Sequence, residues 1–228
     1  VNAMTYQFKK ASIYLVIALF LLSVESCRKK YFATAEDMAE YGWVLYKSKD
    51  YINSNSWFND AVIKDIDWQD AYNGLGWSYS QLAGATAQHV LLDSGINNFM
   101  TALTKPKDEW NITDVQAEVL AGLTFAYHAK GNDSKVLQFG SVFLDSTAKP
   151  LTPGWIFSHD SLLNYLDVRI VMASSYFAKG KFDSTIIQVK VIVDSTKYSK
   201  PAVTDTTLLG RKKMAEQLKE LQEYLRTK

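Results

Sequence analysis

Two glycine–tryptophan pairs that lie 34 residues apart constrain the fold of this 228-residue chain more than any other feature. Gly42 precedes Trp43 and Gly76 precedes Trp77, so the stretches around them align without a gap. A fixed period of this length is typical of proteins built from repeated helix pairs, in which each unit buries its apolar face against its neighbours. A glycine on the packed face of a helix lets a partner helix approach closely. The spacing therefore predicts an all-α fold.

The residues around the second pair resemble a tetratricopeptide repeat. They follow the family spacing W/Y-x2-L-G-x2-Y with Tyr72, Leu75, Gly76 and Tyr79, and the second-helix pattern is matched upstream by Tyr51, Phe58 and Ala61. Positions with this spacing share one face of a helix. The resemblance implies a solenoid of antiparallel helix pairs over residues 35–199, with about four repeats at 35–68, 69–109, 113–150 and 161–199. A C-terminal capping helix is expected within residues 200–228.

The second and third predicted units depart from the family pattern in length and at their start. Unit two is seven residues too long, and we expect an insertion around residues 85–91 to add about two turns to its second helix. Unit three opens with Thr113 and, three residues later, Gln116, which is a capping-box pattern. This pattern places the helix N-cap at Thr113.

The last two units match the family less closely in their packing residues. Thr124 and Ala173 stand where the family has its glycine, and Gly140 with Phe143 replaces the second-helix Phe/Ala pair. Pro150, Pro153 and Gly154 break helix, so residues 147–160 are predicted to form a long connection. Three of its apolar residues are expected to fold back onto the helices: Trp155, Ile156 and Phe157. Residues 209–226 are predicted to form the capping helix, with an apolar stripe at Met214, Leu218, Leu221 and Leu225.

The N-terminal segment resembles a bacterial lipoprotein signal peptide. Lys9 and Lys10 precede a 14-residue apolar run at 11–24, which ends just before Cys27, the only cysteine. As a helix the run is about 21 Å long, short of the roughly 30 Å hydrocarbon core of a membrane. The resemblance implies that residues 1–26 are a signal peptide, that Cys27 is lipidated, and that residues 27–34 are a tether. An uncleaved signal anchor and a secreted protein with a free thiol are the alternatives.

Composition and local spacing argue against several function classes. With 25 Lys plus Arg against 24 Asp plus Glu, the chain has no general attraction for nucleic acid. Its three histidines lie far apart in the sequence, so local spacing indicates no metal site. The run Ser158-His159-Asp160 is interpreted as a loop turn, because three consecutive residues cannot converge as a catalytic triad. We therefore expect no enzyme activity, no cofactor and no metal.

The resemblance also implies a concave groove lined by first-helix residues. Carried over position by position, the groove would contain Trp43, Tyr46, Lys47, Asn73, Trp77, Gln81, Phe125, His128 and Phe177. The same carry-over places four acidic residues on this surface: Glu36, Asp70, Glu118 and Asp167. Trp43, Trp77 and Phe125 would form an aromatic ladder that anchors a partner. The alternative is that these rings pack inside the protein.

These observations predict a lipid-anchored scaffold of the bacterial cell envelope. It would bind a protein or peptide partner through the groove and face the periplasm from the outer membrane. The alternative is a lipoprotein, or an accessory subunit of an enzyme, that binds glycan or peptidoglycan, with sugars stacked on the aromatic ladder. No acid/base pair with a reason for perturbed pKa values supports an enzyme.

Overall fold

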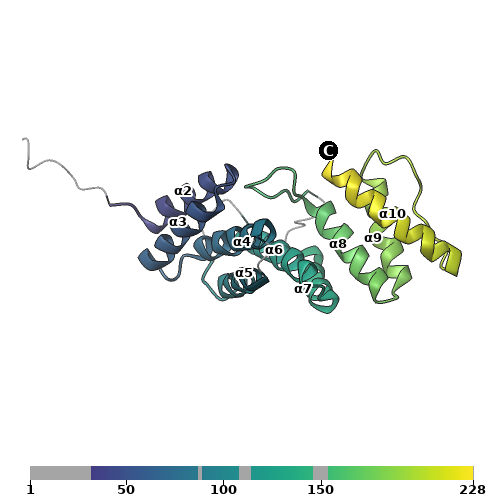
Figure 1. The fold of residues 1–228 in the computed structure, drawn as a ribbon, viewed down its shortest axis with the longest axis horizontal. Helices are drawn as coiled ribbons and strands as arrows, with labels where there is room; N and C mark the ends of the chain where they lie inside the picture. Colours follow the sequence, from purple (N-terminus) through teal and green to yellow (C-terminus); the bar gives the residue numbers. More distant parts are fainter. Residues whose placement is uncertain (1–31, 87–88, 108–113, 146–153, 228) are drawn as a thin grey trace, which may run out of the picture. The chain divides into compact units, whose positions relative to one another are not determined.

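A computed structural model describes residues 32–86, 89–107, 114–145 and 154–227. The predicted signal peptide, Cys27 and most of the tether lie outside these residues. All nine helices of the described residues lie within Thr34–Lys228, the larger of two units into which the chain divides (Figure 1). They are α2 (Ala35–Lys47), α3 (Tyr51–Lys64), α4 (Gln69–Thr86), α5 (His89–Ala102), α6 (Val115–Ala129), α7 (Asp133–Asp145), α8 (Tyr165–Ala178), α9 (Phe182–Asp194) and α10 (Leu208–Arg226).

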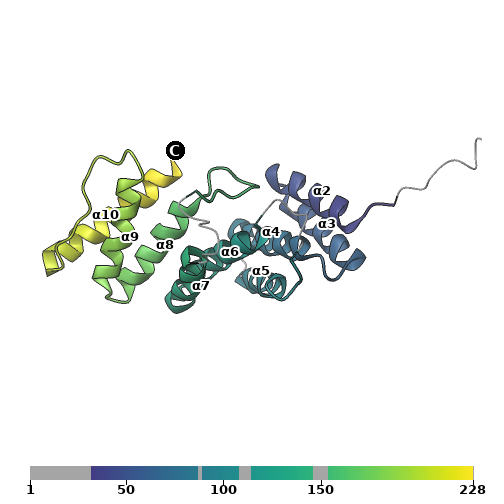
Figure 2. The same cartoon turned by 180° about the vertical axis from the view of Figure 1, so that it is seen from behind.

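The predicted all-α fold is confirmed for the described part of the chain. The only β pairing there is an isolated antiparallel bridge between Ile156 and Asn164. Neighbouring helices pack in pairs: α2 with α3, α4 with α5, α6 with α7, and α8 with α9 (Figures 1 and 2). The first helix of each pair also contacts the first helix of the next, from α2 through α4 and α6 to α8. None of the helices found in the described ranges has the length and apolar character needed to cross a membrane.

Two predicted helix boundaries are wrong. The extra residues of the second pair extend its first helix to Thr86 instead of its second, because Gln81, Leu82 and Ala83 favour helix and Ala83 is buried. The N-cap of α6 is Asp114, whose side chain accepts a hydrogen bond from the Ala117 N–H at 3.2 Å. Aspartate is among the best N-cap residues and occupies the position directly before the helix. Thr113 lies outside the described residues.

A phenylalanine of α3 fills the space between two first helices. Phe58 is fully buried, and its ring lies against Gly42 of α2 and Gly74 of α4. A Cβ atom added at Gly42 would lie 2.8 Å from the ring, and one added at Gly74 would lie 2.2 Å from it. Carbon atoms cannot approach this closely, so glycine at both positions is what allows the ring between α2 and α4.

The next second helix, α5, repeats the arrangement. The ring of Phe99 is buried against Gly76 of α4 and Gly122 of α6. Gly122 is thus the counterpart of Gly74, since each faces the phenylalanine of the preceding second helix, while the buried Thr124 stands at the position that corresponds to Gly76. At the step from α7 to α8 the roles are exchanged, since Gly140 belongs to the second helix and faces Met172 of the next first helix.

Two glycines of α4 give a matched test of this packing. Gly76→Ala would place a Cβ atom 2.4 Å from the Phe99 ring, so we expect a loss of about 1–3 kcal/mol in the free energy of unfolding. Gly84 has open space around it in the same helix, so Gly84→Ala should instead raise this free energy by about 0.5–1 kcal/mol. Urea denaturation measures both values. Equal effects at the two positions would contradict the packing of Phe99 against α4.

The C-terminal helix α10 packs on α8. Its predicted apolar stripe is buried at all four positions, Met214, Leu218, Leu221 and Leu225. Three of these side chains share a second hydrophobic cluster with α8 and α9, separate from the larger cluster that runs from α2 into α8.

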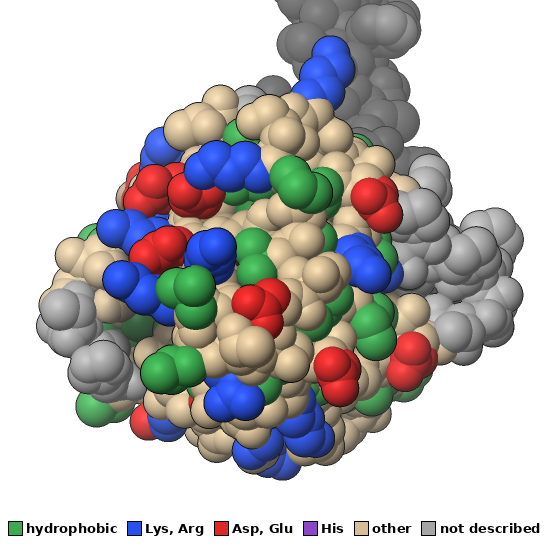
Figure 3. Space-filling view, turned by 90° about the vertical axis from the view of Figure 1, so that its right-hand side faces the viewer, with side chains coloured by type: hydrophobic (Ala, Val, Ile, Leu, Met, Phe, Trp, Pro, Cys, Tyr) green, Lys and Arg blue, Asp and Glu red, His purple; other side chains and the backbone are tan. Residues whose placement is uncertain are grey.

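Figure 3 views the right-hand side of Figure 1, where basic, acidic and hydrophobic side chains alternate without a large area of one charge.

Candidate functional site

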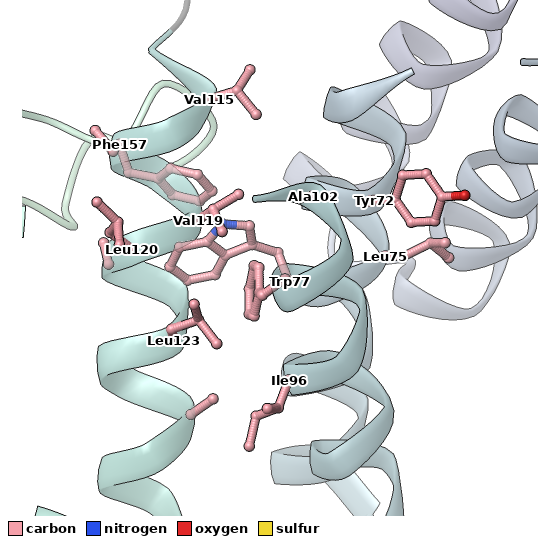
Figure 4. Packing of buried hydrophobic residues seen from close by; sticks show 14 of the residues in the cluster. Tyr72, Leu75, Trp77, Ile96, Ala102, Val115, Val119, Leu120, Leu123 and Phe157 are labelled. Atoms are coloured by element: carbon pink, nitrogen blue, oxygen red, sulfur yellow. The ribbon is translucent and has the colours of Figure 1, made fainter. Parts of the chain in front are cut away.

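The described part of the connection before α8, residues 154–164, lies against the first helices of the preceding pairs. Of its three apolar residues, Trp155 and Phe157 are buried, as predicted, while Ile156 is 58% exposed. The Phe157 ring packs against Trp43 and Tyr46 of α2 and against Trp77 of α4. Figure 4 shows Phe157 beside Trp77 and Val119, where side chains from α4 and α6 meet. A segment of the chain itself therefore occupies this part of the expected groove.

Local hydrogen bonds give the connection its shape. The Phe157 N–H donates to the Leu163 carbonyl at 2.9 Å, and the Leu163 N–H donates to the Asp160 carbonyl at 3.0 Å, which closes a turn. Asn164 then caps α8 together with Asp167 in a capping box. Ser158 and His159 are thus presented at a turn, as the sequence predicts. The ring nitrogens of His159 have no hydrogen-bond partner, so Ser158 and His159 do not form a nucleophile–base pair.

Stacked rings fix the position of the turn. The His159 ring lies flat on the Trp43 indole, with the ring centroids 3.5 Å apart and an interplanar angle of 2°. The Phe157 ring stacks on Trp77 at 4.3 Å. Such contacts between rings stabilise a structure beyond the area that they bury. They hold the turn against both α2 and α4.

Next to the rings lies a polar cluster of Asp70, Asn73, Glu118, Ser158 and His159. We call it the buried polar cluster after its two buried members, Asn73 and Glu118, since Asp70 and His159 are partly buried and Ser158 is exposed. The Asn73 side chain donates from Nδ2 to Asp70 Oδ1 at 3.2 Å and to Glu118 Oε2 at 2.7 Å. Ser158 donates from its Oγ to Glu118 Oε1 at 2.5 Å, and His159 Nε2 lies 3.7 Å from Glu118 Oε2. Residues from α4, α6 and the connection therefore meet at one point.

The environment shifts the pKa values of two groups in this cluster. Burial, followed by the nearby Asp70 carboxylate, raises the pKa of Glu118 to about 7, although hydrogen bonds from Ser158 and Asn73 oppose the shift. Burial, followed by the positive charge of Lys47, lowers the pKa of His159 to about 3. Burial therefore favours the uncharged form of both Glu118 and His159.

The structure places the predicted groove residues in different environments. Four are buried: Trp43, Tyr46, Asn73 and Trp77. Lys47 and His128 are exposed, while Gln81, Phe125 and Phe177 are partly buried. Gln81 donates to the Tyr46 hydroxyl at 3.1 Å. The nine residues therefore do not form one open surface.

The aromatic ladder is not open at its first two positions. Trp43 and Trp77 are each 4% exposed. Trp43 also packs on Phe58, and Trp77 on Phe99, inside their own helix pairs. This burial agrees with the alternative that the rings pack inside the protein. Neither indole offers a free face on which a sugar could stack.

An open pocket lies farther along the same series of first helices. It has a volume of about 400 Å³ and lies between α6, α8 and the end of α10. Its lining combines apolar side chains with charged or polar ones: Phe125, Leu163, Ile170, Val171 and Leu225, with His128, Asp167, Gln222 and Arg226. We call it the α6–α8–α10 pocket. It contains two of the predicted groove residues, Phe125 and His128.

Local spacing in the sequence indicates no metal site, but the fold brings three possible ligands together from distant positions. In the structure, a carboxylate oxygen of Asp70, one of Glu118 and a ring nitrogen of His159 lie within 4.8 Å of one another. Two of these residues had been placed on the groove surface, but His159 had not. The sequence signal that points to His159 is its place in the connection, just after an apolar run that is expected to fold back.

The chain matches no model of a known protein family, and no curated protein is significantly similar to it. Its function has to be argued from its own residues. Two features bear on that function, the α6–α8–α10 pocket and the buried polar cluster.

Proposed function

We propose that this chain is a tetratricopeptide-like interaction scaffold that binds a partner protein in the α6–α8–α10 pocket. The pairwise packing of the helices and the contacts between successive first helices support a repeat array. The observation that carries the proposal is the pocket itself, whose lining combines apolar side chains with charged and polar ones. Concave sites of this composition are the usual places where proteins bind ligands and peptides.

The lining indicates the kind of segment that would fit. Leu225 and Ile170 are buried, while Phe125 is only partly covered, so an apolar side chain of the partner can add to their contacts. Arg226 is exposed at the rim, whereas Asp167 is engaged at the start of α8. The free charge at the rim is thus positive. The expected partner segment carries an apolar anchor beside an acidic residue.

Site-specific photo-crosslinking in cells tests the proposal. A photoreactive residue at position 128, which lines the pocket, should capture the partner, whereas one at position 47, which is also exposed but lies on α2, should not. Arg226→Glu should weaken capture at position 128 because it reverses the charge that faces the acidic residue. Capture at position 47 alone, or capture at position 128 that Arg226→Glu leaves unchanged, would contradict the proposed site.

We also propose that the scaffold is anchored by lipid at Cys27, in the bacterial envelope and on the periplasmic face of the outer membrane. Support comes from the sequence pattern of residues 9–27. Cleavage before Cys27 would remove the 14-residue apolar run from the mature chain. Lipid attached at this cysteine would then supply the membrane affinity. Labelled fatty acid should enter the wild-type chain but not Cys27→Ser, which should also move to the aqueous phase in detergent partitioning. Equal labelling of both chains would contradict the anchor.

A further inference from the structure

Three ligand-type side chains from distant parts of the sequence converge under the turn of the connection. Asp70 comes from the first turn of α4, Glu118 from the first turn of α6, and His159 from the connection. Their donor atoms lie within 4.8 Å of one another. Glu118 is 1% exposed, so this is not a group of surface carboxylates.

Hydrogen bonds hold both oxygens of each carboxylate. The Trp43 indole N–H donates to Asp70 Oδ2 at 2.8 Å, and Ser158 donates to Glu118 Oε1. The other two oxygens, Asp70 Oδ1 and Glu118 Oε2, both accept from the Asn73 amide, which lies between them. Metal ligands in proteins are oriented in this way by outer donors that bind the atoms not facing the ion.

Buried polar atoms in the cluster lack partners. Neither ring nitrogen of His159 accepts or donates a hydrogen bond, although the Trp43 stack fixes the plane of the ring. The Asn73 side chain is fully buried, and its Oδ1 also has no hydrogen-bond partner, while its Nδ2 is bonded to both carboxylates. Atoms of this kind cost free energy unless something else satisfies them.

We propose that Asp70, Glu118 and His159 bind one divalent transition-metal ion. Two carboxylates would neutralise the charge of the ion, and the ion would remove the repulsion between them. An imidazole with two carboxylates suits Zn²⁺ better than Ca²⁺, which prefers oxygen ligands alone. A zinc ion lies about 2.0–2.2 Å from such ligands, so the three donors move slightly toward one another when it binds. On binding, the ion would replace the Asn73 Nδ2 donor at the two carboxylates, and rotation of the amide would turn its unpartnered Oδ1 toward the ion.

This site has a structural consequence that is independent of the proposed partner pocket. The ion would join the connection to α4 and α6 by direct bonds. The segment that fills the groove between α2, α4 and α6 would then be held by metal as well as by ring packing.

Equilibrium dialysis of the chelator-stripped full chain against micromolar Zn²⁺, followed by metal analysis, tests the proposal. We expect the wild type to bind one ion per chain and to melt at a higher temperature with zinc than without. Zinc should also change the tryptophan fluorescence of the chain, because the Trp43 indole donates to one ligand and stacks on another. Ca²⁺ should have none of these effects.

Three variants separate loss of ligands from loss of folding. His159→Phe keeps a ring on Trp43 but removes the nitrogens, and Asp70→Asn keeps an acceptor for the Trp43 indole. Ser158→Ala keeps all three ligands and removes one outer donor. Each should weaken zinc binding by at least about tenfold while the circular dichroism spectrum stays helical. His128→Gln is the matched control, because it removes an exposed histidine outside the cluster.

Two results would overturn the proposal. One is the absence of zinc from the wild type after dialysis. The other is zinc binding that does not depend on the proposed ligands. His159→Phe and Asp70→Asn would then leave the affinity unchanged, or His128→Gln would reduce it as strongly as they do, and the ion would be bound by surface groups.

Discussion

Replacing Phe157 with alanine is expected to lower the free energy of unfolding by about 3–5 kcal/mol. The side chain is 1% exposed and contacts rings from α2 and α4. Its loss would leave a cavity under the connection that neighbouring aromatic rings, held by their own helix pairs, cannot close. Chemical denaturation followed by circular dichroism measures the effect. A loss of this size is comparable to much of the stability of a domain.

The adjacent residue supplies the control. Ile156 belongs to the same segment but is 58% exposed, so Ile156→Ala should change the free energy of unfolding by no more than about 0.5 kcal/mol. If the two variants had equal stability, the connection would not be packed on the first helices.

The second large effect concerns how the free energy of unfolding depends on pH. We expect it to change with pH in opposite directions in two variants. The pKa of Glu118 is raised from 4.5 to about 7 in the folded state. The folded state therefore holds this proton more tightly, and the stability that it contributes is lost as the pH rises from 4.5 to about 7. The pKa of His159 is lowered from 6.5 to about 3. Its contribution is lost as the pH falls from 6.5 to about 3.

Between pH 4.5 and 6.5 the two contributions oppose each other in the wild type. Each variant removes one of them. His159→Phe should lose about 2–3 kcal/mol of stability as the pH rises through this range, and Glu118→Gln should lose a similar amount as the pH falls. The free energy of unfolding is measured with a chelator present, because a bound cation would keep both groups unprotonated. Parallel pH profiles of the two variants would contradict the burial of this pair.

The period of the sequence predicts the helices because it records how they pack. Each of two second helices inserts a phenylalanine between first helices, and glycines make room for it. This demand fixes Gly42 and Gly76, which carry the visible repeat. Gly74 and Gly122 meet the same demand from the following pair, two positions before the family glycine, so the family pattern alone does not single them out.

The buried polar cluster could not be predicted in full, because it depends on where a connection lies. The apolar character of Trp155 and Phe157 indicates that they fold back, but no periodic pattern says against which helices. The repeat positions of Asp70 and Glu118 place both on the expected groove, together with Glu36 and Asp167. Their pairing with His159 follows only from the turn that Asp160 and Leu163 close. The aromatic ladder was misplaced for the same reason, since the connection covers its first two rings.

The nuclear Overhauser effect between the rings of His159 and Trp43 tests the central claim most directly. The chain has three histidines, so the signals of His159 are identified by their loss in His159→Phe. With the ring centroids 3.5 Å apart, the ring protons of His159 should show strong cross-peaks to the indole protons of Trp43. Their absence in a protein with intact helices would show that the connection does not occupy the groove between α2, α4 and α6.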